Sequence, residues 1–137
     1  MGEEGLMSGQ EAAIAVFLAG YPPEIAAICQ QLRALVARVA PDAREVLVAR
    51  QNHIAYAVSD RLSARIAYIC PLRAWVRLGF YYGGALDDLP DAAGLLEGEG
   101  KRLRHVKVRT LAQAEAPALA WLLAAGWAAG AAALARR

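Results

Sequence analysis

The sequence has few of the residues from which metal sites and nucleophilic active sites are usually built. Cys29 and Cys70 are its two cysteines, and His53 and His105 are its two histidines. None of the four lies at a metal-ligand spacing from another, and there is no Gly-x-Ser-x-Gly or paired-acid motif. We therefore expect a binding domain rather than an enzyme, unless folding assembles a catalytic site from distant residues.

The chain also lacks the features of an exported protein. Its amino terminus has neither the basic start nor the apolar run of a signal peptide. Cys29 and Cys70 fall within apolar patterns, as buried free thiols in a reducing compartment do, although two cysteines can also meet as a disulfide. We expect a cytoplasmic protein.

The length of 137 residues fits one domain, with its core at about residues 10–128 and frayed ends at residues 1–8 and 130–137. An apolar share of 58% and a charged share of 20% argue against disorder. Residues 116–135 carry no charge and are long enough to cross a membrane, but alanine dominates them and favours insertion weakly. We expect no membrane span but a helix that caps the core or pairs with a second copy in a homodimer.

Three helices are predicted at the two ends of the chain. The first follows a capping-box motif at Ser8–Glu11 and ends at Gly20. The second begins near Pro23 and has apolar residues at helical spacing. The last follows a second capping-box motif at Thr110–Gln113 and has Pro117 in its first turn.

Between these helices the apolar residues alternate with a period of two, which is typical of strands. Four or five strands are predicted, at residues 45–49, 54–58, 65–70, 75–82 and 103–109. In the third, Ile66 and Tyr68 are expected on one face and Arg65 on the other. Because the first links are short, the strands should form antiparallel hairpins. The predicted fold is an α+β two-layer sandwich, with N-terminal helices, an antiparallel sheet and a C-terminal helix.

A basic segment covers residues 98–110, which hold five Lys or Arg and one Glu. The whole chain has a net charge of +2, so any attraction to a polyanion would be local. A phosphate-binding Walker A loop is excluded because Lys101 is followed by Arg102 rather than Ser or Thr. The segment is instead predicted as a strand, whose alternation directs Val106 and Val108 toward the helices and His105, Lys107 and Arg109 outward.

Aromatic and basic side chains of the neighbouring strands are predicted to share that outward face. The full candidate set is Arg65, Trp75, Arg77, Tyr81, His105, Lys107 and Arg109. Such a surface suits a small anionic ligand or a protein partner, and less well a single-stranded nucleic acid, since no RNP motif is present. The plain alternative is a solvated strand face that helps solubility and pairs with the acidic loop before it.

That loop contains only acids among its charged residues: Asp87, Asp88, Asp91, Glu97 and Glu99. Carboxylates could hold a hard cation, but the spacing lacks the alternation and the glycine of an EF-hand. A solvated loop is the alternative.

Two long segments of the chain resemble a known family. They are FLAGYPPEIAAICQQLRALVARVAPDAREVL at residues 17–47 and VRLGFYYGGALDDLPDAAGLLEGEGKRLRHVKVRTL at residues 76–111. Both are similar to the YdhG-like family of small bacterial proteins, also called DUF1801, and the resemblance extends over about residues 12–123. It implies an α+β sandwich with helices on one face of an antiparallel sheet.

Most of that family has no assigned function, but some members are described as frataxin-like iron chaperones. This resemblance implies, as an alternative function, iron binding through acidic residues for iron–sulfur cluster assembly. The first two predicted helices here carry only Glu11 and Glu24 as acids, which departs from that pattern. The acidic loop is then the remaining place for iron ligands.

Overall fold

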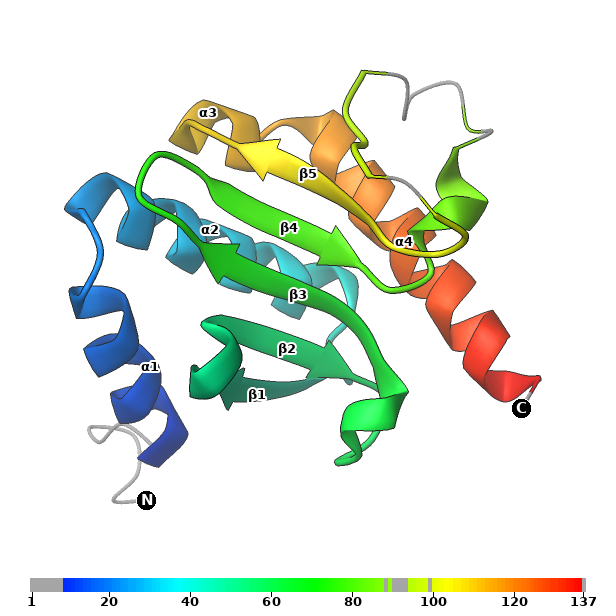
Figure 1. The fold of residues 1–137 in the computed structure, drawn as a ribbon, viewed down its shortest axis with the longest axis horizontal. Helices are drawn as coiled ribbons and strands as arrows, with labels where there is room; N and C mark the ends of the chain where they lie inside the picture. The colour runs from blue at the N-terminus through cyan, green and yellow to red at the C-terminus, as the bar shows by residue number, and fades with distance from the viewer. Residues whose placement is uncertain (1–8, 88, 90–93, 99, 137) are drawn as a thin grey trace.

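The structure is a computed structural model of the chain, and it describes residues 9–87, 89, 94–98 and 100–136 (Figure 1). Its helices are α1 (Gly9–Ala19), α2 (Pro23–Val39), α3 (Leu111–Ala114) and α4 (Pro117–Ala135). Its strands are β1 (Arg44–Val48), β2 (His53–Ala57), β3 (Arg65–Pro71), β4 (Val76–Phe80) and β5 (Arg104–Val108).

The strands form one antiparallel sheet in the order β1-β2-β3-β4-β5, so each strand pairs with its neighbours in the sequence. Helices α2 and α4 lie behind this sheet in Figure 1, and the face toward the viewer has no helix on it. The predicted α+β sandwich, with N-terminal helices, an antiparallel sheet and a C-terminal helix, is confirmed.

One capping box is present and the other cannot be described. Thr110 Oγ1 accepts a hydrogen bond from the backbone N–H of Gln113 at 3.1 Å, and Gln113 Oε1 accepts one from the backbone N–H of Thr110 at 3.2 Å. Ser8 lies outside the described residues. The carboxylate of its predicted partner Glu11 binds Arg33.

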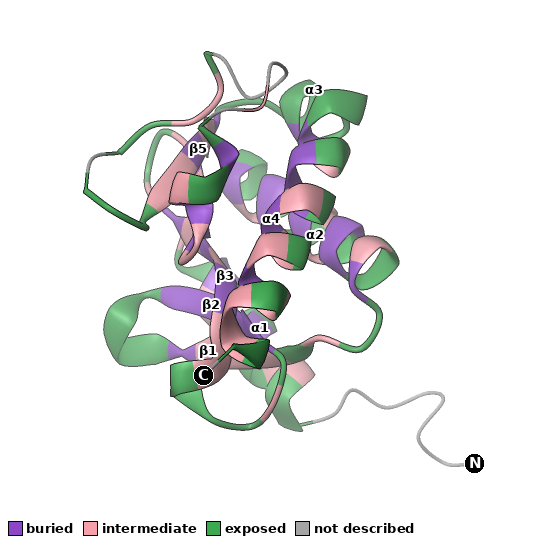
Figure 2. Ribbon diagram, turned by 90° about the vertical axis from the view of Figure 1, so that its right-hand side faces the viewer, coloured by how far each residue is buried: buried purple, intermediate pink, exposed green. Residues whose placement is uncertain are grey.

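The core lies between the helices and one face of the sheet. Leu32 and Leu35 of α2 and Leu122 of α4 are buried there, opposite Ile69 and Leu78 of the central strands. Figure 2 shows these facing surfaces as the main buried layer of the molecule. Because side chains alternate along a strand, the residues between these core positions point to the open side of the sheet.

The predicted alternation of β3 is wrong at its start. Ala57 of β2 pairs with Arg65 whereas Tyr56 pairs with Ala67, so Ile66 is an extra residue at a β-bulge. Ile66 is fully buried and contacts Gly130 of α4, whereas Tyr68 lies on the open side. Because of the bulge, Ile66 and Tyr68 lie on opposite faces of the sheet rather than on the same face. Arg65 lies on the open side, as the sequence predicted.

The two cysteines lie in different environments. Cys29 is buried in α2, but Cys70 pairs across the sheet with Arg77 on the open side and is only half-buried. Both thiols are free. The core position expected for Cys70 is therefore wrong, because its strand alternates around the buried Ile69.

Helix α4 packs on the sheet through its two glycines. A Cβ atom at Gly126 would lie 2.6 Å from the Phe80 ring, and one at Gly130 would lie 2.5 Å from Ile66. The uncharged segment thus caps the core, and the helix continues through residues 130–135, which we expected to fray. Among the described residues, α4 is the one helix whose length and composition would allow a membrane span.

A charged cluster ties α1 to the sheet on the covered side. Arg33 of α2 donates five hydrogen bonds, to both carboxylate oxygens of Glu11, both of Glu45 and the side chain of Gln30, at 2.7 to 2.9 Å. The hydroxyl of Tyr56 donates to Glu45 at 2.6 Å. A guanidinium has five N–H donors, so Arg33 is fully paired.

Candidate functional site on the open face of the sheet

The open face is the side of the sheet away from α2 and α4. Register places Tyr68, Gly79 and His105 in one row across β3, β4 and β5. The next row contains Cys70, Arg77 and Lys107. Residues directly opposite in an antiparallel ladder lie on the same face, so these side chains are neighbours.

Five of the seven predicted residues gather at one end of the open face, and we call them the Arg77 cluster: Trp75, Arg77, His105, Lys107 and Arg109. Arg77 and Lys107 are register partners on β4 and β5. Lys107 Nζ lies 5.0 Å from the centre of the Trp75 ring, and the Arg109 guanidinium lies 5.9 Å from it. Both cations therefore lie within range of the electron-rich ring.

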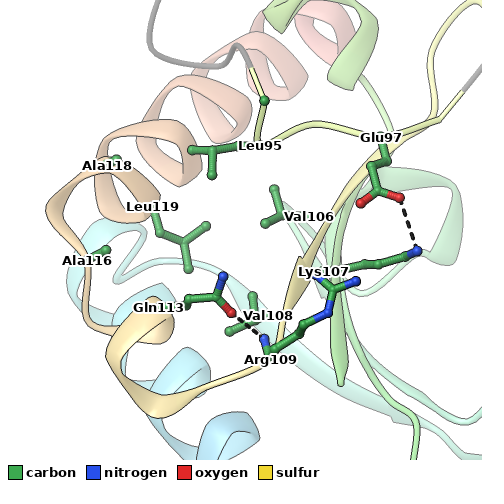
Figure 3. Close-up of a pocket in the computed structure, with 11 residues that line it drawn as sticks. Leu95, Glu97, Val106, Lys107, Val108, Arg109, Gln113, Ala116, Ala118 and Leu119 are labelled. Atoms are coloured by element: carbon green, nitrogen blue, oxygen red, sulfur yellow. Dashed lines mark hydrogen bonds and ion pairs between the residues drawn. The ribbon is translucent and has the colours of Figure 1, made fainter. Parts of the chain in front are cut away.

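One acid lies at the edge of the Arg77 cluster. The Glu97 carboxylate lies 3.3 Å from Lys107 Nζ (Figure 3). Glu97 also pairs with β5 as an isolated bridge to His105, and its carboxylate lies 3.9 Å from His105 Nε2. This pairing partly fulfils the plain alternative, in which the acidic loop neutralises the basic strand. No described carboxylate forms an ion pair with Arg77.

The other two predicted residues form a pair at the opposite end of the open face. The guanidinium of Arg65 lies 4.8 Å from the centre of the Tyr81 ring. Next to them, Arg102 lies 5.9 Å from the centre of the Tyr82 ring, and a hollow of about 370 Å³ opens between the four side chains. The seven residues therefore share a face but form two groups rather than one concave surface.

Sequence reasoning missed the aromatic side chains that join the two groups. The Tyr68 ring lies 5.0 Å from the His53 ring and 5.4 Å from the Tyr81 ring. It lies across Gly79, where an added Cβ atom would come within 2.0 Å of it. A glycine inside a strand signals such a close approach, and that signal could have indicated Tyr68.

Three buried polar atoms on this face have no hydrogen-bond partner among the described residues. They are His53 Nε2, Trp75 Nε1 and Arg77 Nε. Buried polar groups are almost always paired in folded proteins, so an unpaired one indicates that water or a ligand supplies the partner. All three lie on the open face, and two belong to the Arg77 cluster.

Burial keeps the histidines of this face uncharged. It lowers the pKa of His105, the charges of Arg77 and Lys107 lower it further, and Glu97 opposes them. Burial and the charge of Arg65 also lower the pKa of His53. The positive charge of the open face at neutral pH therefore comes from arginine and lysine.

The acidic residues suggested for iron binding have other partners where the structure describes them. Arg104 donates to both oxygens of the Asp87 carboxylate, at 3.1 and 3.3 Å from Nε and 2.9 Å from an Nη atom, which lowers the pKa of Asp87. Glu97 faces Lys107 and His105. Asp88, Asp91 and Glu99 lie outside the described residues. Within the described part of the chain, no group of three His, Cys, Asp or Glu residues could hold a metal ion.

Comparison of the chain with protein-family models, with curated proteins and with solved structures finds no match.

Proposed function

We propose that the protein binds a small anionic ligand on the open face of the sheet, at the Arg77 cluster. In this proposal it is a non-enzymatic cytoplasmic binding domain, and the resemblance of the segments quoted above supports a YdhG-like protein. A protein partner with an exposed carboxylate or phosphate would meet the same chemistry.

The observation that carries the proposal is the state of Arg77. Its Nε atom is buried without a hydrogen-bond partner among the described residues, and no described carboxylate pairs with its charge. A half-buried guanidinium is unfavourable without an anion nearby. An anionic ligand would provide both the missing acceptor and the missing charge.

The neighbours of Arg77 support the same chemistry. Lys107 lies directly opposite on β5, and the indole N–H of Trp75 is a second donor for which the described part of the chain offers no acceptor. Hydrogen bonds from cationic groups to an anion contribute about 1.5–3 kcal/mol each. Two such bonds amount to about 3–6 kcal/mol, which corresponds to a dissociation constant of roughly 0.1 to 10 mM, so weak binding is expected.

Calorimetric titration with inorganic phosphate tests this proposal. Wild-type protein should bind phosphate, and Arg77→Met should weaken binding roughly 10- to 100-fold while keeping the aliphatic stem. Arg38→Met, at an exposed position of α2, is the matched control and should leave binding unchanged. Equal binding by wild type and Arg77→Met would contradict the proposal.

The nucleic-acid and iron alternatives predict other results. A single-stranded oligonucleotide should bind with an affinity that falls steeply with salt if the open face is a nucleic-acid surface. Ferrous iron should give heat in the micromolar range if the acidic loop is a metal site. Either result, with no phosphate binding, would favour its alternative.

A further inference from the structure

A second feature lies beside the Arg77 cluster, at the free edge of β5. There a hollow of about 140 Å³ opens between β5, residues 94–97 and the start of α4 (Figure 3). Its walls are largely apolar, with Leu95, Val106 and Leu119 around it. We call it the β5-edge hollow.

The edge of β5 directs unpaired backbone groups into this region. His105 exchanges two backbone hydrogen bonds with Glu97, at 2.7 and 2.9 Å. Alternate residues of an antiparallel strand direct their N–H and C=O to the same side, so Lys107 directs its own to the same edge. No described backbone group pairs with them there.

A side-chain donor also faces the hollow. Gln113 Oε1 accepts hydrogen bonds from the backbone N–H groups of Arg109 and Thr110, at 2.5 and 3.2 Å, which fixes the orientation of the amide. The Nε2 atom then points into the hollow, as Figure 3 shows. No described acceptor takes its hydrogens.

From these features we infer that the ligand is a carboxylate with a short aliphatic chain, and that the chain lies in the β5-edge hollow. The Lys107 N–H and the Gln113 amide would donate to the carboxylate, next to the charges of Lys107 and Arg109. An apolar cavity of roughly 150 Å³ holds one benzene molecule, so about six carbons fit a hollow of this size. Glu97 at the rim disfavours a polyanion.

This inference rests on the proposed function only through Lys107 and Arg109, which belong both to the Arg77 cluster and to the lining of the hollow, whereas Arg77 itself does not line it. It adds the apolar part of the ligand. A carboxylate held only on the open face would show no preference for chain length, and this difference makes the two ideas separable.

The test is a calorimetric titration with acetate, butyrate, hexanoate and the neutral hexanamide. Each buried methylene should raise affinity roughly fourfold, so hexanoate should bind roughly tenfold or more tighter than butyrate. Hexanamide should bind more weakly than hexanoate. Equal affinity for acetate and hexanoate, or for hexanoate and hexanamide, would overturn the inference.

Two variants locate the chain and the head group. Ala118 is exposed and lines the hollow, so Ala118→Phe should fill it and remove the chain-length preference, whereas Ala124→Phe on the exposed side of α4 should not. Gln113→Glu keeps the capping oxygen but replaces the donor by a charge, and should weaken hexanoate binding at least tenfold. Circular dichroism confirms that each variant folds. A chain-length preference that persists in Ala118→Phe would overturn the inference.

The two proposals can fail separately. Phosphate and acetate binding that depends on Arg77, without any chain-length preference, would overturn the inference and keep the proposed function. Hexanoate binding that depends on Ala118, together with phosphate binding that does not depend on Arg77, would keep the inference and contradict the proposed site. Binding of none of the probes would overturn both.

Discussion

Two arginines on opposite sides of the same sheet differ in how their charges are paired. On the covered side, Arg33 donates all five of its N–H groups, four of them to the carboxylates of Glu11 and Glu45. On the open side, Arg77 has a buried Nε atom with no partner among the described residues. The first arginine is part of what holds the fold together, and the second has capacity left for a ligand.

The difference extends to the surroundings of each residue. Tyr56 and Glu45 continue the Arg33 network without a gap, since the tyrosine hydroxyl donates to the carboxylate. Around Arg77 the neighbouring charges are positive, apart from Glu97 at the edge of the cluster. Removing each charge should therefore have opposite consequences, which the following predictions use.

The largest effect is expected for Arg33→Met. The substitution leaves the half-buried Glu45 and the buried Tyr56 hydroxyl without their cationic partner, and breaking such a network is expensive. Because the carboxylates reach solvent, we expect a loss of about 2–4 kcal/mol in the free energy of unfolding. Urea denaturation measures it, with Arg38→Met as control. A loss no larger than that of the control would contradict the account.

A smaller loss is expected for Gly126→Ala on the covered side. The added methyl group would meet the fully buried Phe80 ring at 2.6 Å, and overpacking of this kind costs about 1–3 kcal/mol. The higher helix propensity of alanine offsets about 1 kcal/mol of this cost, so we expect a net loss of about 1 kcal/mol in the free energy of unfolding. Ala124→Gly, at an exposed site of α4, measures the propensity alone. A stabilised Gly126→Ala protein would show that α4 does not pack closely on β4.

The open face should make stability depend on pH. The pKa values of His53 and His105 are lowered by burial, so the unfolded chain binds more protons than the folded one below about pH 6.5. The free energy of unfolding should therefore fall as pH falls from 7 to 5, by at most about 1.4 kcal/mol per pH unit for each histidine. His105→Gln should reduce the slope in urea denaturation across this range. Stability that is flat or rises toward pH 5 would contradict this.

The smallest effect on stability is expected for Arg77→Met. Arg77 lies near the Tyr68 hydroxyl, but no described carboxylate pairs with its charge. Removing such a charge from a half-buried position costs little and can stabilise, so we expect a change within about 0.5 kcal/mol or a gain. Urea denaturation measures this change in the free energy of unfolding. Because both variants replace an arginine by methionine, the values for Arg33→Met and Arg77→Met are directly comparable. A loss as large as that of Arg33→Met would show that Arg77 has a structural partner.

Local patterns in the sequence were sufficient for most of the fold. The period of two and the short links predicted the antiparallel meander. The capping motif at Thr110 predicted a helix start, but it begins the separate short helix α3 rather than the last helix, α4. The bulge at Ile66 was not predicted, and the buried Ile66 packs against Gly130 of α4, which lies far along the chain. Long-range packing of this kind leaves no local signature.

The candidate site was predictable in composition but not in arrangement. Alternation placed the basic residues of β5 outward, yet it could not show that Arg65 and Tyr81 lie apart from Arg77. The hydrogen bonds of Arg33 to Glu11 and Glu45 were not predicted either, since the two acids belong to different elements and come together only in the fold. Pairing between distant charges decides which arginine is structural, and the sequence alone does not contain it.

The most direct test of the central claim uses the indole N–H of Trp75 as a reporter. This group is buried in the Arg77 cluster, with no acceptor among the residues that the structure describes, and its resonance can be assigned by Trp75→Phe. In two-dimensional NMR, addition of phosphate should shift the Trp75 indole signal, while those of Trp121 and Trp127 on α4 stay in place. The shift should saturate and should be absent in Arg77→Met. An indole signal that does not move with phosphate, or that moves equally in Arg77→Met, would contradict anion binding at the open face.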